Sequence, residues 1–142
     1  MSTVHGVLVD ASVLLDIVTE DTQWCAWSSE ALATWAERVP LYINVVIYAE
    51  VSIGFARIEE VEAVLPLEAF RRVPVPWEAG FLAGKAFVVY RQRGGTRTLP
   101  LPDFFIGAHA AVAELALLTR DPQRIRTYFP QVHLIAPPSP SP

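Results

Sequence analysis

The segment LPLPDFFIGAHAAVAELALLTRD, residues 99–121, predicts a buried helix followed by a buried strand. Asp103 follows a proline-rich approach, at the place of a helix N-cap, and the apolar run that begins at Phe104 is typical of a helix inside a core. Residues 115–119, LALLT, then have the composition of a buried parallel strand. One carboxylate therefore begins the helix, and Asp121 follows the strand.

The composition is that of a single α/β domain. The chain has 142 residues, is 52% hydrophobic and has a mean hydropathy of +0.33, which suits a sheet covered on both faces. Only 18% of the residues are charged, so we expect apolar surface that a second copy or a hydrophobic partner would cover. We expect the domain to span residues 1–136 and the tail PPSPSP, residues 137–142, to be disordered.

Charge and cysteine content exclude several classes of protein. A net charge of −4 argues against binding of nucleic acid through bulk positive charge, but not against a carboxylate site whose sign a metal ion inverts. Cys25 is the only cysteine, which excludes an intramolecular disulfide and a cysteine zinc site. No signal peptide or membrane span is evident, so we expect a cytoplasmic protein without membrane contact.

Short apolar runs alternate with helical patterns along the chain. This alternation predicts an α/β fold with three layers, in which helices flank a parallel sheet on both faces. The third strand contains a proline, which places it at an edge of the sheet. The expected strands are residues 7–9, 41–43, 71–75, 115–119 and 132–135, and the expected helices are 12–18, 24–39, 45–58, 59–65, 77–93, a helix from 103, and 122–128.

Four acidic residues stand out: Asp10, Glu50, Asp103 and Asp121. Three of them follow predicted strands or begin a predicted helix, and open α/β sheets bind ligands at the carboxyl ends of their strands. Glu50 lies in the apolar sequence VVIYAEVSI with no Lys or Arg one turn away, so it must be protonated, paired with a distant residue or bound to a cation.

Each acid also has a simpler explanation. Asp103 and Asp121 could cap helices, Asp10 could be a turn residue after a strand, and Glu50 could pair with a distant arginine. A non-catalytic acidic pocket that binds a metal or a phosphoryl group in a regulatory module is the alternative function. A phospho-receiver needs paired acids after the first strand and a late lysine, and a phosphatase with a nucleophilic Asp needs a second Asp where Ser12 stands. Neither pattern is present.

Carboxylate oxygens without cysteine ligands favour Mg²⁺ or Mn²⁺. Ions held by such a cluster activate water and stabilise charge in the cleavage of a phosphodiester, and this chemistry requires no histidine base.

The sequence resembles the PIN-domain ribonucleases, and among them the VapC-type toxins of toxin–antitoxin pairs. The resemblance covers about residues 6–136 and rests on the order and spacing of VLVDASVLLD, IYAEV, LPLPDFFIGAHA and LLTRDPQRIRTYFPQVHLI. It implies a PIN-like sheet of five parallel strands, a Mg²⁺- or Mn²⁺-dependent endoribonuclease, a homodimer and a small cognate antitoxin.

By matching motifs, the resemblance implies that Asp10, Glu50, Asp103 and Asp121 hold the metal and are the catalytic residues. Ser12 and Thr119 match small hydroxyl residues of the first and last motifs and would be accessory. His109 departs from the pattern, because the family often has a small residue or threonine there, and we interpret this histidine as structural.

Basic residues near these motifs are candidates for RNA binding. Residues 79–102 contain several basic residues and no acid, so Arg93 and Arg97 could contact phosphates, although a solvated helix face is an equal alternative. Arg120 lies between Thr119 and Asp121 and could contact RNA or an antitoxin. Asp16 is interpreted as an acid on a helix surface.

Overall fold

The structure is a computed structural model and describes residues 3–138. Its strands are β1 (Val7–Val9), β2 (Leu41–Ile43), β3 (Arg71–Arg72), β4 (Ala116–Leu118) and β5 (Leu134–Ile135). Its helices are α1 (Ala11–Val18), α2 (Cys25–Ala36), α3 (Val45–Ser52), α4 (Ile58–Val64), α5 (Trp77–Gln92), α6 (Pro102–Ala113) and α7 (Gln123–Tyr128). Residues 139–142 of the expected disordered tail lie outside the described residues. Within the described range, no helix is both long and apolar enough to cross a membrane.

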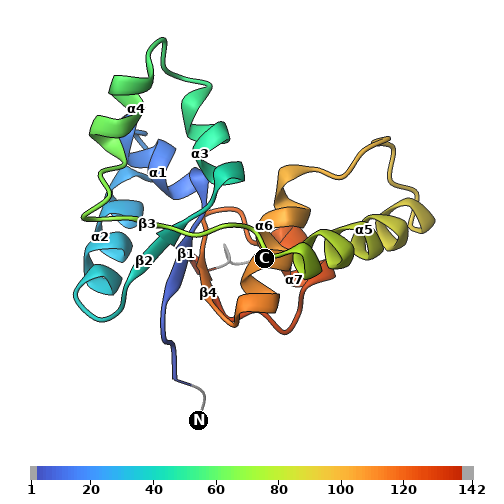
Figure 1. The fold of residues 1–142 in the computed structure, drawn as a ribbon. Coiled ribbons are helices and arrows are strands. Elements are labelled where there is room, and N and C mark those ends of the chain that lie inside the picture. Colours follow the sequence, from blue (N-terminus) through green and yellow to red (C-terminus); the bar gives the residue numbers. More distant parts are fainter. Residues whose placement is uncertain (1–2, 139–142) are drawn as a thin grey trace.

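The five strands form one parallel sheet in the order β3-β2-β1-β4-β5, which confirms the predicted α/β fold and the edge position of β3. The chain runs along the sheet in one direction from β1 to β3 and then returns to β4 and β5 on the other side of β1. Because parallel crossovers are right-handed, this reversal puts the two sets of helices on opposite faces. Figure 1 shows α1 to α4 on one side and α5 to α7 on the other.

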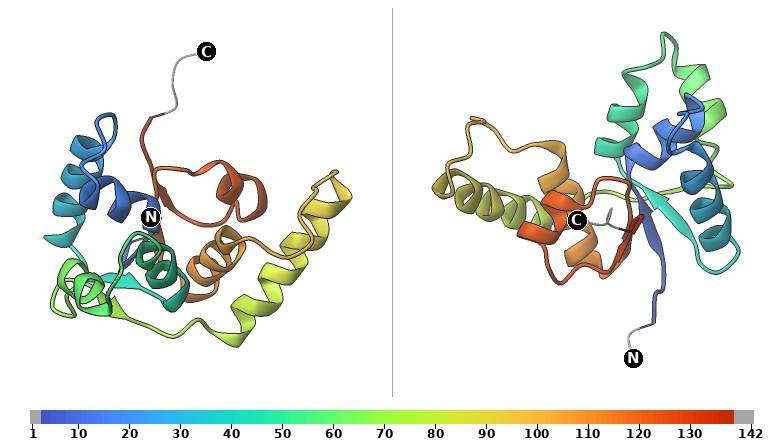
Figure 2. Two further views of the ribbon diagram at one scale, coloured as in Figure 1. Left: turned by 90° about the horizontal axis from the view of Figure 1, so that it is seen from above. Right: turned by 180° about the vertical axis from the view of Figure 1, so that it is seen from behind.

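The reversal between β1 and β4 positions the candidate site, because open α/β sheets bind ligands where the strand order changes direction. Asp10 follows β1, and Thr119 to Asp121 follow β4. Seen from above, α3 lies between α1 and α6 (Figure 2), and α3 contacts both of these helices. The helices that carry Glu50 and Asp103 are therefore neighbours at the same edge of the sheet.

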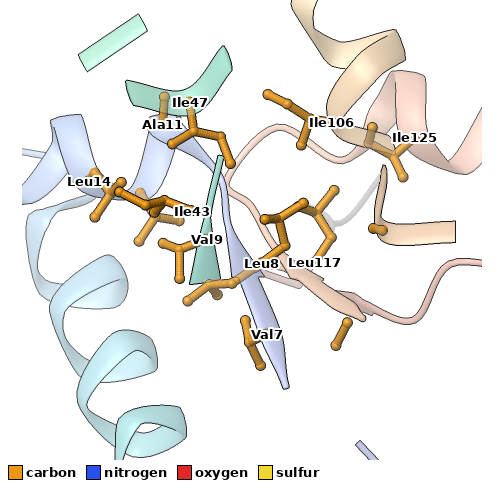
Figure 3. Close-up of a cluster of buried hydrophobic side chains, with 14 of the residues drawn as sticks. Val7, Leu8, Val9, Ala11, Leu14, Ile43, Ile47, Ile106, Leu117 and Ile125 are labelled. Carbon is orange, nitrogen blue, oxygen red and sulfur yellow. The ribbon is translucent and has the colours of Figure 1, made fainter. Parts of the chain in front are cut away.

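The two central strands are buried on both faces. Figure 3 shows the alternation expected of a strand, with Leu8 directed toward Ile106 and Ile125 and with Val9 directed toward Ile43 and Leu14. All three residues of β1 are fully buried. This explains the unbroken apolar run of the strand, which a sheet exposed on one face would not have.

The ends of the helices correct several boundaries. Residues 53–58 do not continue α3, and β3 has two residues rather than the five predicted. Helix α6 begins at Pro102, with Leu101 as its N-cap, so the prediction that Asp103 is the N-cap is wrong. Proline suits the first helical position because its fixed φ is helical and it has no N–H to leave unpaired. Glu114, with φ of 55°, ends α6 in the left-handed conformation.

Gly107 allows α6 to pack closely on α7, which explains the glycine in an otherwise apolar helix. A Cβ atom at this position would lie 2.5 Å from Cδ2 of Phe129 and 3.0 Å from Cδ1 of Ile125, and both side chains are buried. We therefore expect Gly107→Ala to lower the free energy of unfolding by about 1–3 kcal/mol, because a close-packed core tolerates extra volume poorly. Urea denaturation measures this loss. Gly80→Ala on α5 is the control, since a Cβ there meets nothing within 4 Å, and an equal loss in both variants would contradict the packing argument.

Candidate metal-dependent nuclease site

Asp10 is held by two hydroxyl groups. Ser12 Oγ donates to Asp10 Oδ2 over 2.6 Å, and Thr119 Oγ1 donates to the same oxygen over 2.9 Å. Asp10 has the N-cap position of α1 but makes no side-chain capping bond. Both hydroxyl oxygens also accept hydrogen bonds from backbone N–H groups of the segment after β4. Ser12 Oγ accepts from the N–H of Arg120, and Thr119 Oγ1 accepts from the N–H of Asp121. The network fixes Oδ2 and leaves Oδ1 of Asp10 without a bond to a neighbouring side chain among the described residues.

Among the described residues, Glu50 is the acid with an unsatisfied buried oxygen. Its Oε1 is buried and has no hydrogen-bond partner among the described residues. Burial, followed by the negative charges of Asp10 and Asp103, raises the pKa of Glu50 to about 7. Within residues 3–138 no arginine pairs with Glu50, so the structural ion pair that the sequence left open is not formed there. A carboxyl group with a buried, unpaired oxygen beside two other acids is costly unless a proton or a cation compensates it.

Asp103 lies in the first turn of α6 and makes an ion pair that the sequence analysis missed. Arg124 Nη1, on α7, lies 3.0 Å from Asp103 Oδ2. Burial and the nearby Asp10 raise the pKa of Asp103, and the guanidinium of Arg124 opposes that shift. The signal was the basic helix QRIRTY after the last acid, but spacing does not show which of its arginines faces the site.

Asp121 is the most exposed of the four acids. Its carboxylate lies 3.3 Å from Arg120 Nη1, and it lines one cavity together with Asp103. The N-cap of α7 is Pro122, and no side chain in the described part of the chain caps this helix, so Asp121 is not a helix cap.

The arrangement fits a hard divalent cation in its donor chemistry. All four acids offer oxygen ligands, and a buried carboxylate oxygen of Glu50 lacks a partner. As the side chains stand, residues 3–138 contain no group of three or more Asp, Glu, His or Cys close enough to hold an ion together. This is consistent with mutual repulsion between the acids and with the pull of Arg124 on Asp103. Asp10, Glu50, Asp103 and Asp121 remain the predicted ligands and catalytic residues.

Comparison with known proteins places this architecture in a family. The model of the PIN domain matches residues 7–130. The chain belongs to the PIN-domain family. No curated protein sequence matches the chain.

Solved structures with the same fold are distant in sequence. A chain of VapBC2 from Rickettsia felis bound to a DNA fragment from their promoter is 15% identical, with a TM-score of 0.71 over 92% of this chain and 98% of that one. A toxin–antitoxin complex from Klebsiella pneumoniae is 22% identical, with a TM-score of 0.60 over 89% and 94%. FitAcB from Neisseria gonorrhoeae is 18% identical, with a TM-score of 0.63 over 90% and 95%. These similarities show the PIN-like fold over almost the whole domain.

Arg120 and Asp16 form a partly buried ion pair at the margin of the PIN site. Arg120 Nε and Nη2 lie 3.1 and 3.0 Å from the two oxygens of Asp16, and Ser28 donates a further hydrogen bond to this carboxylate. The Asp16 side chain is only 3% exposed, so its interpretation as a helix-surface acid is wrong. Arg120 therefore anchors the segment after β4 to α1. Its predicted contact with RNA is untested.

The other basic candidates, Arg93 and Arg97, lie at the end of α5 and in the segment that follows it. The guanidinium of Arg93 lies over the ring of Tyr128, with Cζ 5.6 Å from the ring centroid. The backbone of Arg97 is held by α5, since its N–H donates to Tyr90 Oη and its carbonyl accepts from Arg91. RNA binding by Arg93 and Arg97 stays a prediction. Arg93 lies over Tyr128 and the N–H of Arg97 donates to Tyr90, and both tyrosines line the cavity beside Asp103.

His109 is buried in α6 and links this helix to α3. Asn44 Oδ1 accepts the N–H of Ile47 as the N-cap of α3, so Asn44 Nδ2 is the group that donates to His109 Nδ1 over 2.9 Å. Burial lowers the pKa of His109, which favours the neutral ring. The structural interpretation of His109 is confirmed, and its hydrogen bond holds together the two helices that carry Glu50 and Asp103.

Glu50→Gln should stabilise the metal-free protein at neutral pH. Below about pH 4.5 Glu50 is protonated in both the folded and the unfolded state, but between pH 4.5 and 7 the folded state retains more protons, so wild-type stability falls as pH rises. With allowance for solvent screening of this half-buried group, we expect Gln to add about 1–2 kcal/mol at pH 8 and nothing near pH 4.5. Thermal melts in EDTA across this range measure the difference. A benefit that is independent of pH, or largest at low pH, would contradict the assigned shift.

Proposed function

We propose that this PIN domain is a Mg²⁺- or Mn²⁺-dependent endoribonuclease and the toxin of a cytoplasmic toxin–antitoxin pair. The observation behind this proposal is Glu50, a half-buried carboxyl group whose Oε1 has no hydrogen-bond partner among residues 3–138 and whose pKa is raised by burial and by the charges of Asp10 and Asp103. Three mutually repelling acids lie where the strand order changes direction, between β1 and β4, and their repulsion destabilises the folded protein. Binding of a divalent cation offsets that cost.

In this proposal each residue has a separate task. Asp10, Glu50, Asp103 and Asp121 provide oxygen ligands, and Ser12 and Thr119 orient Asp10 through its Oδ2. The bound metal would supply a water of lowered pKa and stabilise charge on the scissile phosphate. Arg124, paired with Asp103, places a positive charge where an anionic strand must approach the acids.

The related folds support the assignment of a partner. The structures of similar fold include VapBC and FitAB assemblies and a toxin–antitoxin complex. By analogy we propose that a small antitoxin protein binds this chain and blocks the acidic site.

Cleavage of RNA tests the enzymatic proposal. Purified protein is incubated with a panel of structured and single-stranded RNAs in Mg²⁺, in Mn²⁺ and in EDTA. We expect cleavage in the two metal buffers and none in EDTA. Cleavage that continues in EDTA, at a rate equal to that in metal, would overturn the metal-dependent mechanism.

Helix α5 is the face on which we propose the homodimer. Trp77, Phe81 and Val88 recur on one side of this helix with exposures of 93%, 69% and 48%, and a Cβ at Gly84 on the same side would meet nothing within 4 Å. Figures 1 and 2 show α5 along an edge of the molecule, packed on α6 by its other side.

A charge at the centre of this stripe should separate the subunits. We expect light scattering to give a dimer for wild type and a monomer for Phe81→Glu, because a buried unpaired carboxylate is costly. Thr34→Glu, on the exposed side of α2, controls for the added charge. A Phe81→Glu protein that remains dimeric would exclude α5 as the interface.

A further inference from the structure

A cavity adjoins two of the four acidic residues. It has a volume of about 440 Å³ and lies between the end of α5, the start of α6 and helix α7. Asp103 and Asp121 form one side of it. A strand whose phosphodiester is held at the acids would continue into this cavity.

The other lining residues have the chemistry of a nucleotide site. They provide a guanidinium, two phenol rings, an amide and a hydroxyl, from Arg124, Tyr90, Tyr128, Gln123 and Thr127. Cations bind phosphates, aromatic faces stack on bases, and amide and hydroxyl groups form hydrogen bonds with base edges. The lining therefore offers contacts to the phosphate, to the face of the base and to the edge of the base of one nucleotide.

Arg124 is positioned to contact a phosphate. Of the five N–H groups of its guanidinium, one donates to Asp103 Oδ2, and no other hydrogen bond of Arg124 occurs among the described residues. Its side chain is about one-third exposed. The guanidinium can therefore keep its bond to Asp103 and still offer a fork of donors to a phosphate oxygen.

Tyr128 and Arg93 provide planar groups beside the guanidinium of Arg124. The ring of Tyr128 is half-buried and packs against Tyr90 at 6.3 Å and Phe104 at 5.4 Å between centroids, which fixes its orientation. Arg93 extends over Tyr128 from the end of α5, and its own side chain is exposed. Both the aromatic ring and the guanidinium plane are surfaces on which a base stacks.

We propose that this cavity binds the unpaired nucleotide adjoining the scissile phosphodiester. Arg124 contacts the phosphate of that nucleotide, and Tyr128 with Arg93 contacts the base. The base must leave its pair to present a face to the ring, so the site selects single-stranded RNA over a duplex. This assignment rests on the proposed ribonuclease function, which supplies the phosphodiester at the acids.

Binding rather than cleavage provides the test. The parent is Asp10→Asn, which we expect to hold RNA without cutting it. The probe is a fluorescein-labelled single-stranded RNA of mixed sequence, and its binding is followed by fluorescence anisotropy. Arg124→Gln and Arg93→Gln are each added to this parent. The control is Arg126→Gln. Arg126 is an exposed arginine of α7 outside the lining of the cavity, and its substitution removes the same charge. The affinity for the same RNA annealed to its complement is measured in parallel.

We expect Arg124→Gln to raise the dissociation constant for single-stranded RNA about tenfold or more, and Arg93→Gln about fivefold. Arg126→Gln should change it less than about threefold, as loss of one screened charge does. The duplex should bind the parent more weakly than the single strand. Because Arg93 is exposed, its variant tests the cavity even if Arg124→Gln unfolds.

Equal effects of Arg93, Arg124 and Arg126, or no binding of single-stranded RNA by the parent, would overturn the proposal. If the Arg124 and Arg93 variants bind RNA more weakly than the Arg126 variant but wild type cleaves no RNA, the nucleotide site is supported and the nuclease function is rejected. If wild type cleaves RNA in a metal-dependent way but Arg124→Gln and Arg93→Gln bind RNA as the parent does, the nuclease function is supported and the nucleotide site is rejected.

Discussion

Asp10→Asn is expected to lower RNA cleavage by more than about 100-fold without unfolding the protein. The asparagine oxygen can still accept the hydrogen bonds of Ser12 and Thr119, so the local structure persists. The amide nitrogen replaces the second oxygen and removes both a negative charge and a ligand. Loss of residues that merely support metal ligands already costs about 10–100-fold, and loss of a ligand exceeds this. The measurement is the initial rate of cleavage in saturating Mn²⁺.

Glu30→Gln is the matched control for this prediction. Glu30 lies on the exposed face of α2 and also loses one negative charge on substitution. We expect it to cleave at the wild-type rate. If Asp10→Asn and Glu30→Gln retain the same activity, the acidic site is not where cleavage occurs.

Arg120→Met is expected to lower the free energy of unfolding by about 2–4 kcal/mol. The substitution leaves the almost fully buried Asp16 with only the hydroxyl of Ser28 as a donor, and an unpaired buried charge is costly. It also removes the packing of Arg120 on Trp24, whose ring centroid lies 5.8 Å from Cζ. Urea denaturation at pH 7 measures the loss.

The double variant Asp16→Asn with Arg120→Met separates the ion pair from the packing. Removal of both charges should restore most of the lost stability, because the asparagine can accept the bond of Ser28 without carrying a charge. Unchanged stability of Arg120→Met together with weaker RNA binding would instead assign Arg120 to the RNA surface.

Much of the fold followed from the apolar runs. The sequence VLV of β1 and ALL of β4 lacks the alternation of a half-exposed sheet, and both strands are central and buried on both faces. The boundaries were less accurate where local patterns are ambiguous. Residues 53–58 continue an apolar sequence but leave the helix near Gly54, and the polar residue Glu114 ends α6 through a left-handed conformation that composition does not indicate.

The positions of the four acids were predicted from their places in the order of elements, but their partners were not. Asp16 lies six residues after Asp10 on a short helix, and the sequence does not show that it turns inward to meet Arg120, which is distant in the chain. The same holds for Arg124 and Asp103, which come from different helices. Ion pairs between distant residues depend on the final packing, whereas strand order depends on patterns that each segment carries itself.

Calorimetric titration of Mn²⁺ into wild type, Glu50→Gln and Asp10→Asn at pH 7.5 tests whether the acids of this PIN domain form a metal site. We expect wild type to bind Mn²⁺ and each variant to bind at least about tenfold more weakly, since each loses a charged oxygen ligand. Glu30→Gln should bind as wild type does. Equal affinity in all four proteins, or no binding by wild type, would contradict the account.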